Sequence, residues 1–164
     1  MKNSPLQSNE GFIQIYHRHV DMVYRICFIY MKNKYDTEDM VQNTFIRLMN
    51  HDITFENYEH EKAWLIRTAT NLCKDHFKSW WKKRVRINNN VSDKRQETFV
   101  IDGTLKKVLS LPPKYKAVIY MYYYEGYSTV DIAHILNKNE STIRGQLLTA
   151  RKRLKAMIER ESEQ

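Results

Sequence analysis

The spacing of apolar residues after Tyr127 constrains this chain most, because it predicts two consecutive amphipathic helices around a tight turn. Apolar residues fall on one face of a helix between 130 and 136, and they recur at three- and four-residue spacing between 143 and 158. The residues between the two runs, Asn137-Lys138-Asn139, tolerate the backbone angles of a turn. Two helices joined in this way predict a helix-turn-helix.

Capping residues and charge support this prediction. The Ser128 hydroxyl can accept from a free backbone N–H while Asp131 reaches back in a capping box, and Asn139 or Ser141 can cap the second helix. Basic and amide side chains of the second helix lie outside its apolar stripe, and Arg and Gln suit bidentate base contacts in the major groove. A basic face can also be merely solvated, but two capped helices around a short turn favour a DNA-binding module.

The densest positive charge lies outside the helix-turn-helix. The chain carries a formal net charge of +8, and residues 62–86 hold eight Lys and Arg against one Asp. Residues 1–61 instead hold six Lys and Arg against nine Asp and Glu. A positive block of this kind can neutralise phosphates with release of counterions. It is therefore a second candidate surface for nucleic acid.

The N-terminal half is expected to form three helices that share one core. Apolar residues recur at helical spacing over 12–31, over 36–48 and over 62–83. The second of these helices is expected to start near Asp36 or Thr37, where acidic residues suit the positive end of a helix dipole. Residues 51–61 are expected to form a loop.

The C-terminal half follows a segment that has almost no apolar period, residues 85–104, which predicts a flexible linker. A short helix from Leu105 to Leu109 comes next, and then a helix from Pro113 to Glu125 with Gly126 as its left-handed cap. Most tyrosines at 120–124 are expected in the core. Since no segment alternates with period two, the sequence predicts an all-α fold of two small helical domains, residues 11–84 and 105–160, the second containing the helix-turn-helix.

Several function classes lack the residues that they need. The four glycines form neither a G-x-G-x-x-G motif nor a P-loop, and the six histidines show no metal-site spacing. Cys27 and Cys73 are interpreted as small core residues. We therefore expect no enzyme, no cofactor, no metal site and no small-molecule substrate. The apolar stretches are shorter than the ~20 residues of a membrane span and residues 1–10 do not resemble a signal peptide, so a cytoplasmic location is expected.

Three motifs in chain order resemble one protein family. They are DMVQNTF at 39–45, AWLIRTATNLCKD at 63–75, and LPPKY at 111–115 followed by the helix-turn-helix that ends in ARKRL at 150–154. In these motifs the chain is similar to the bacterial extracytoplasmic-function (ECF) sigma factors, which consist of the second and fourth conserved sigma regions only. The resemblance implies a region-two-like domain at 11–84 and a region-four-like domain at 105–160.

The resemblance implies an alternative sigma factor, which binds core RNA polymerase, directs it to specific promoters and helps to open the duplex. In the family, one helix of region two docks on the largest polymerase subunits. The docking positions that carry over are Asp39, Gln42, Phe45 and Arg47. Asn43 stands where the family usually has Glu. Many relatives are held inactive by an anti-sigma factor. The resemblance therefore implies an anti-sigma factor as a further candidate partner.

The resemblance also assigns DNA contacts to both domains. The loop from Phe55 to Glu61 would receive an extruded base, while the third helix would read and melt the proximal promoter element. The residues carried over for that element are Phe55, Asn57, Tyr58, Arg67, Asn71, Lys74, Lys78, Trp80, Trp81, Lys82, Lys83 and Arg84. Those carried over for the upstream element are Thr142, Arg144, Gly145, Gln146, Leu148, Thr149, Arg151 and Arg153. Gly145 replaces a Ser that is common in the family, and Thr149 stands where a basic residue is frequent.

A stand-alone transcriptional regulator is the alternative. It would bind operator DNA as a dimer through the same helix-turn-helix, with residues 11–84 serving for dimerisation and half-sites about one helical turn apart. A dimerisation domain does not require the positive block at 62–86, so the sequence favours the sigma factor. A nucleic-acid-processing enzyme, the third class, lacks a metal or nucleophile constellation.

Overall fold

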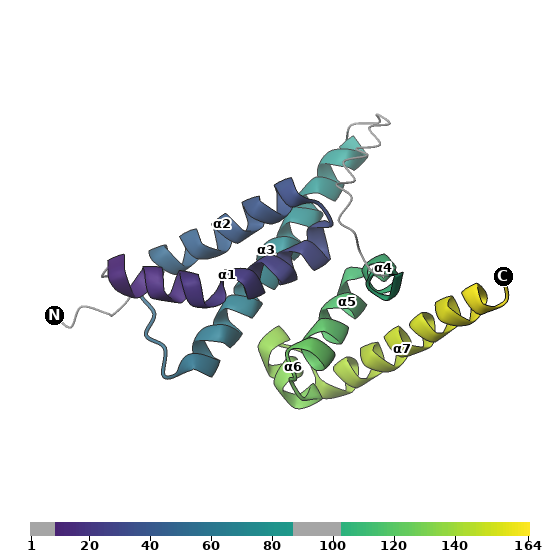
Figure 1. Cartoon of the computed structure of the whole chain (residues 1–164). Coiled ribbons are helices and arrows are strands. Elements are labelled where there is room, and N and C mark those ends of the chain that lie inside the picture. The colour runs from purple at the N-terminus through teal and green to yellow at the C-terminus, as the bar shows by residue number, and fades with distance from the viewer. Residues whose placement is uncertain (1–8, 87–102) are drawn as a thin grey trace. The chain divides into compact units, whose positions relative to one another are not determined.

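The computed structural model describes residues 9–86 and 103–164 and is helical, with no β-strand in the described ranges (Figure 1). The chain divides into two compact units, one within residues 1–97 and one within 98–164. The all-α prediction is therefore confirmed. Most of the predicted linker, residues 87–102, lies outside the described residues, while 85–86 end one helix and 103–104 begin the next.

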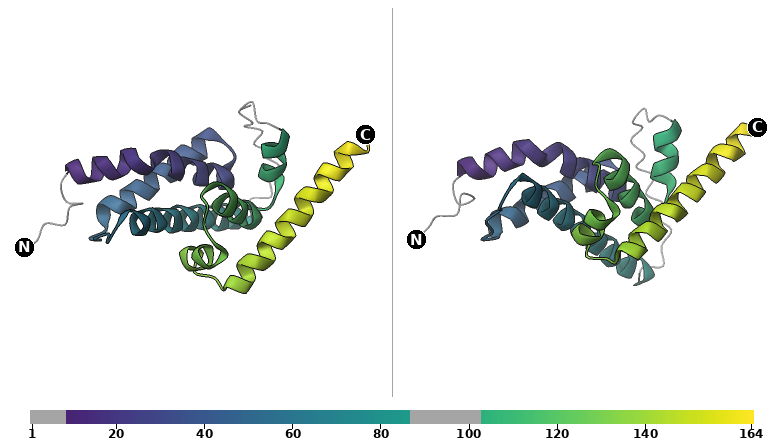
Figure 2. Two further views of the ribbon diagram at one scale, coloured as in Figure 1. Left: turned by 60° about the horizontal axis from the view of Figure 1, so that its bottom comes forward. Right: turned by 90° about the horizontal axis from the view of Figure 1, so that it is seen from below.

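The first unit consists of α1 (Asn9–Met31), α2 (Lys34–Asn50) and α3 (Tyr58–Arg86). In the views of Figures 1 and 2, α1 and α2 run side by side and α3 packs against them. The side chains with no exposed area at the centre of this unit are Val23, Cys27, Leu48, Leu65, Ile66, Ala69 and Cys73. Both cysteines are free thiols and buried, as expected for small core residues. A hydrogen bond with Cys27, together with burial, raises the pKa of the Cys73 thiol.

Two helices of this unit begin earlier than the sequence predicted, each because an Asn caps it. Asn33 accepts a hydrogen bond from the Asp36 backbone N–H at 2.8 Å, so α2 begins at Lys34 and the break after α1 is only two residues long. Asn57 accepts from the His60 N–H at 2.9 Å, and α3 begins at Tyr58 rather than at Lys62. The residues from Tyr58 to Glu61, expected in the loop, thus form the first turn of α3.

The second unit contains α4 (Gly103–Ser110), α5 (Pro113–Ile119), a π-helical turn η2 (Tyr120–Tyr124), α6 (Thr129–Leu136) and α7 (Glu140–Ser162). The long helix α7 packs against α4, α5 and α6. The apolar side chains of this unit that are at most 2% exposed are Leu111, Val118, Met121, Ile132, Ile143, Leu147 and Ala150, and they form its core. Gly126 has a φ of 75°, as expected of a left-handed cap.

The expectation that most tyrosines at 120–124 are core residues is wrong. Met121 is the buried residue of this turn, whereas the side chains of Tyr123 and Tyr124 are 60% and 63% exposed. Five consecutive residues span more than one helical turn, so they cannot share one buried face. The structure assigns the inward position to Met121, leaves Tyr120 and Tyr122 half-buried, and exposes Tyr123 and Tyr124.

Candidate nucleic-acid interface

The helix-turn-helix is formed by α6 and α7. Ser128 caps α6, since its Oγ accepts from the Asp131 N–H at 3.1 Å and donates to the Asp131 carboxylate at 2.8 Å. The Asp131 side chain thus reaches back to the Ser128 hydroxyl and not, as in a capping box, to its backbone N–H. Asn137, with a φ of 53°, ends α6, and Asn139 holds the N-cap position of α7 without a side-chain hydrogen bond.

The first three turns of α7 carry the predicted upstream-element residues from Thr142 to Thr149. Ile143 and Leu147 are buried against the unit, whereas Thr142, Arg144, Gly145 and Leu148 are exposed and Gln146 and Thr149 are half-buried. A Cβ added at Gly145 would meet no atom within 4 Å, so packing within the chain does not require this glycine. Since Gly in a helix costs about 1 kcal/mol relative to Ala, a close approach of DNA to its backbone stays a prediction.

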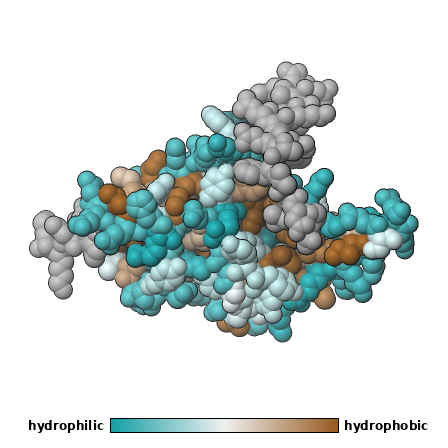
Figure 3. All heavy atoms as spheres, viewed as in Figure 1, coloured by the Kyte–Doolittle hydropathy of each residue, from teal (hydrophilic) through white to brown (hydrophobic). Residues whose placement is uncertain are grey.

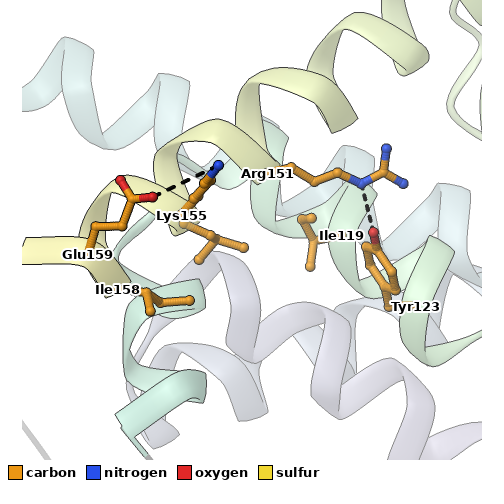
Figure 4. A pocket seen from close by; sticks show the side chains of 7 residues that line it. Ile119, Tyr123, Arg151, Lys155, Ile158 and Glu159 are labelled. Atoms are coloured by element: carbon orange, nitrogen blue, oxygen red, sulfur yellow. Dashed lines mark hydrogen bonds and ion pairs between the residues drawn. The ribbon is translucent and has the colours of Figure 1, made fainter. Parts of the chain in front are cut away.

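Arg151 and Arg153, predicted to contact DNA, are exposed and lie against tyrosines of their own unit. The Arg151 Nε–H donates to the Tyr123 hydroxyl at 2.7 Å (Figure 4). Its guanidinium also lies 5.4 Å from the Tyr122 ring centroid. The hydrogen bond to Tyr123 raises the pKa of Arg151. The Arg153 guanidinium lies 4.8 Å from the Tyr115 ring centroid. The tyrosine contacts thus orient both exposed side chains, and their contact with DNA stays a prediction.

A groove of about 470 Å³ lies where α7 crosses the end of α5 (Figure 4). Its apolar walls are Ile119, Leu154 and Ile158, and an ion pair between Lys155 and Glu159 of 3.9 Å stands at its edge. Ile158, expected in the buried stripe of α7, is 50% exposed. Helical spacing predicted that Ile158 lies on the same face as Leu154, but it could not show that the groove beside Ile119 leaves this side chain half open.

In the first unit, α3 carries the residues predicted for the proximal element. Arg67, Asn71, Lys74 and Lys78 follow one another at four-, three- and four-residue spacing, so they share one face of the helix. Lys74 is half-buried, and the exposed members of the predicted set on α3 beyond the first turn are Arg67, Asn71, Lys78, Lys82 and Lys83. The side chains of Trp80, Trp81 and Arg84 lie outside the described part of the structure.

The loop before α3 packs on the first two turns of that helix. The Glu56 backbone N–H donates to Nδ1 of His60 at 3.2 Å, and the Phe55 ring lies edge-on to the His60 and Trp64 rings, at 5.4 and 5.9 Å between centroids. Asn57 is engaged as the cap of α3. Tyr58 is 49% exposed and lies beside His19, 5.1 Å between ring centroids.

A cluster of three ionisable side chains joins the start of α3 to α1, and sequence reasoning missed it. Glu61 on α3 accepts hydrogen bonds from Arg18 at 3.0 and 3.2 Å and lies 2.6 Å from Nε2 of His19. The His19 side chain is 1% exposed and that of Glu61 9%. These partners are more than forty positions apart, so no local pattern in the sequence indicates the cluster.

This cluster predicts a pH dependence of stability. Burial, aided by Arg18 and Lys62, lowers the pKa of His19 below its usual 6.5 despite the opposing effect of Glu61. The unfolded chain therefore takes up the proton first as the pH falls, so this contribution to stability is present above pH 6.5 and is lost as the pH falls toward the folded-state pKa. We expect a lower free energy of unfolding in urea at about pH 5.5 than at about pH 7.5, and a weaker dependence in His19→Gln. Equal pH dependence in the two proteins would contradict this.

The outward face of α2 carries three of the four predicted docking residues. Asp39, Gln42 and Arg47 are exposed, but Phe45 is 4% exposed and packs against Tyr16, 4.8 Å between ring centroids. Phe45 thus lies in the core. In this position it supports α2 by packing and is not part of the outward face of the helix.

Sequence reasoning missed two exposed apolar residues of the same helix. Ile46 is 50% and Met49 63% exposed, and they continue the stripe of Gln42 at four- and three-residue spacing. Hydrophobic residues interrupt the hydrophilic surface over α1 and α2 in Figure 3. The available signal was their spacing, which places both residues off the buried stripe of Met40, Phe45 and Leu48.

Neither a metal site nor a membrane-spanning helix is found in the described residues. No group of His, Cys, Asp and Glu within 9–86 or 103–164 is arranged to hold a metal ion. No helix in the same ranges has the length and apolar character needed to cross a membrane.

Comparison with known proteins gives two matches to family models, in chain order. Residues 15–83 match Sigma-70 region 2, and residues 105–154 match Sigma-70, region 4. The ECF RNA polymerase sigma factor SigM of Bacillus subtilis is 30% identical over 158 residues, which cover 90% of this chain and 94% of that protein. SigW of the same organism is 27% identical over 168 residues, covering 91% of this chain and 89% of that protein.

Solved structures show the same fold. The sigma factor RpoE of Bartonella quintana, in complex with the anti-sigma factor NepR, aligns with a TM-score of 0.67 at 21% identity over 92% of this chain and 98% of that one. CnrH, in complex with the cytosolic domain of CnrY, aligns with a TM-score of 0.63 at 18% identity over 93% of this chain and 90% of that one.

Proposed function

This chain belongs to the ECF RNA polymerase sigma factors, and from that premise we propose how its two units divide the work of transcription initiation. It is an alternative sigma factor that directs RNA polymerase to specific promoters. The observation that carries this function is the presence of sigma regions 2 and 4, in that order, along most of one chain. A stand-alone dimeric regulator is not favoured, because it has no use for region 2.

The first unit, residues 11–84, binds core polymerase through the outward face of α2. Asp39, Gln42 and Arg47 supply polar contacts to the largest subunits, and the exposed pair Ile46 and Met49 supplies the apolar centre. An apolar patch with a polar rim is the usual composition of a protein interface, which supports this assignment. RNA synthesis itself is left to the polymerase, and the protein acts where the polymerase is, in the cytoplasm.

The same unit opens the duplex with α3 and the loop before it. Arg67, Lys74 and Lys78 contact phosphates, while Asn71 on the same face contacts an unpaired base. Phe55 is placed by the loop to stack on an extruded base. Extruding a base costs a few kcal/mol, which stacking and hydrogen bonds to its edge offset.

The second unit, residues 105–160, reads the upstream element with the first three turns of α7. Arg144 and Gln146 contact base edges, while Thr142, Gly145, Leu148 and Thr149 lie along the groove. Arg151 and Arg153 support this helix through their tyrosine contacts.

Residues 85–104 join the two units as a linker. An anti-sigma partner is part of the proposal, because the structurally similar RpoE was solved with one.

Run-off transcription tests this function. Purified chain and core polymerase are incubated with a library of promoter fragments, and transcripts and co-purification with core are measured. We expect initiation at a subset of fragments and weak promoter binding without core. Binding as a dimer to palindromic sites without polymerase, and no transcript from any template, would contradict the proposal.

Arg144→Ala is expected to weaken binding to upstream-element DNA by about 1–2 kcal/mol. The loss lies toward the lower end of the usual range because Arg144 already has a partner in Glu140, 3.8 Å away. Affinity is measured by fluorescence anisotropy for the wild-type element and for single-base variants. Arg160→Ala is the matched control, since Arg160 is equally exposed but lies in the last turn of α7. Equal losses of affinity in the two variants would show that Arg144 contributes only its positive charge and makes no specific contact with a base.

A further inference from the structure

The cluster of Arg18, His19 and Glu61, here called the α1–α3 clamp, has no place in the functions assigned above. Its carboxylate is almost fully buried and receives three short contacts from α1. Burying charged groups costs free energy that a well-packed apolar set would not, so such a cluster contributes less to stability than to a defined geometry. The clamp therefore serves to fix the start of α3 against α1.

The clamp holds the one turn of α3 on which the preceding loop depends. Glu61 lies in the same turn as His60, which binds the Glu56 backbone and contacts the Phe55 ring. Asn57 caps this turn and bonds the His60 N–H. The path of residues 51–57 thus follows from the position of the first turn of α3.

The clamp also forms one wall of a pocket of about 160 Å³ beside the loop. Ile53, Thr54 and Phe55 of the loop line one part of this pocket, and Arg18 and Glu61 line another. A displacement of the first turn of α3 would change the pocket and the Phe55 ring together. The fully buried apolar side chains that α1 and α3 share, among them Val23, Cys27, Leu65 and Cys73, lie one or more turns further along the two helices than the clamp.

We propose that Glu61 is a positioning residue for base recognition: through Arg18 and His19 it holds residues 51–57 against α1 in the geometry that accepts an unpaired promoter base. This inference rests on the proposed function of the loop and α3. Glu61 itself does not contact the base. Its loss shifts the loop while the apolar core keeps α1 and α3 together.

The test compares Glu61→Gln with the wild-type chain in complex with core polymerase. Open-complex formation is measured on promoters that carry each of the four bases at each proximal-element position, and affinity for core is measured separately. We expect discrimination between bases to fall about three- to tenfold, the effect of one or two lost hydrogen bonds, with core affinity unchanged within about twofold. Asp21→Asn, which removes an exposed carboxylate from α1 beside the clamp, is expected to change neither quantity.

Equal losses of core affinity and base discrimination, or no loss of discrimination, would overturn the proposal. If Glu61→Gln is unfolded at the assay temperature, Arg18→Gln takes its place, because this side chain is 44% exposed and its removal still deletes two of the contacts. Where both variants fold, the double variant should discriminate no worse than Glu61→Gln, since the residues act as one unit. If the losses of base discrimination in the two single variants add up in the double variant, Arg18 and Glu61 act independently, which would contradict the clamp. A wild-type chain that initiates at no promoter would count against the proposed function instead.

Discussion

Phe45→Ala is expected to lower the free energy of unfolding of the first unit by about 3–5 kcal/mol. The ring is 4% exposed and packs edge-on against Tyr16 and Phe12, so truncation leaves a cavity and removes two aromatic contacts. Urea unfolding of the full chain, followed by circular dichroism, measures the change. Phe45→Leu, which keeps most of the volume, is expected to lose less.

Met49→Ala is the matched variant on the same helix. Its side chain is 63% exposed, so its free energy of unfolding should change by no more than about 0.5 kcal/mol while affinity for core polymerase falls. Surface plasmon resonance on immobilised core measures that affinity. A Phe45→Ala chain that is as stable as the wild type would contradict the packing of Phe45 against α1. Unchanged affinity for core polymerase in Met49→Ala would contradict docking through the outward face of α2.

Asn71→Ala is expected to reduce open-complex formation on the order of 100-fold, because an unpaired base then loses hydrogen bonds that offset its extrusion. Asn71 is exposed on α3 and faces away from the core, so stability should change little. Permanganate reactivity of unpaired thymines in complexes with core polymerase measures the opening.

A template with a pre-melted bubble at the proximal element is the control for this variant. The duplex need not be opened there, so the defect of Asn71→Ala should shrink on it, while affinity for core remains that of the wild type. A defect of the same size on both templates, or an equal loss of core affinity, would show that Asn71 does not act in strand opening.

Local interactions explain why much of the fold was predictable. Ser128, Gly126 and the Asn-rich turn end and begin helices through contacts within a few residues, and these are visible in the sequence. The caps that were missed, Asn33 and Asn57, are of the same kind. At both places the polar residues that follow the cap looked like a continuing loop, so the predicted helices began two and four residues late.

Contacts between distant helices explain what was not predictable of the candidate site. Phe45 and Met49 lie four residues apart on one helix, yet one packs on α1 and the other faces outward. Arg151 and Arg144 look alike in sequence, but only Arg151 lies beside the tyrosines of η2. In both cases the difference comes from the neighbouring helix, and helical spacing does not specify where that neighbour passes.

The sequence by itself determined the helical class, the helix-turn-helix and the order of the two sigma regions, because these depend on spacing, caps and motifs within short stretches of chain. Only the tertiary structure decided that Tyr123 anchors Arg151 at the surface, and that Glu61 is bound to Arg18 and His19. The physical reason is that a buried ion cluster and a cation on an aromatic ring form only after packing has brought their helices together.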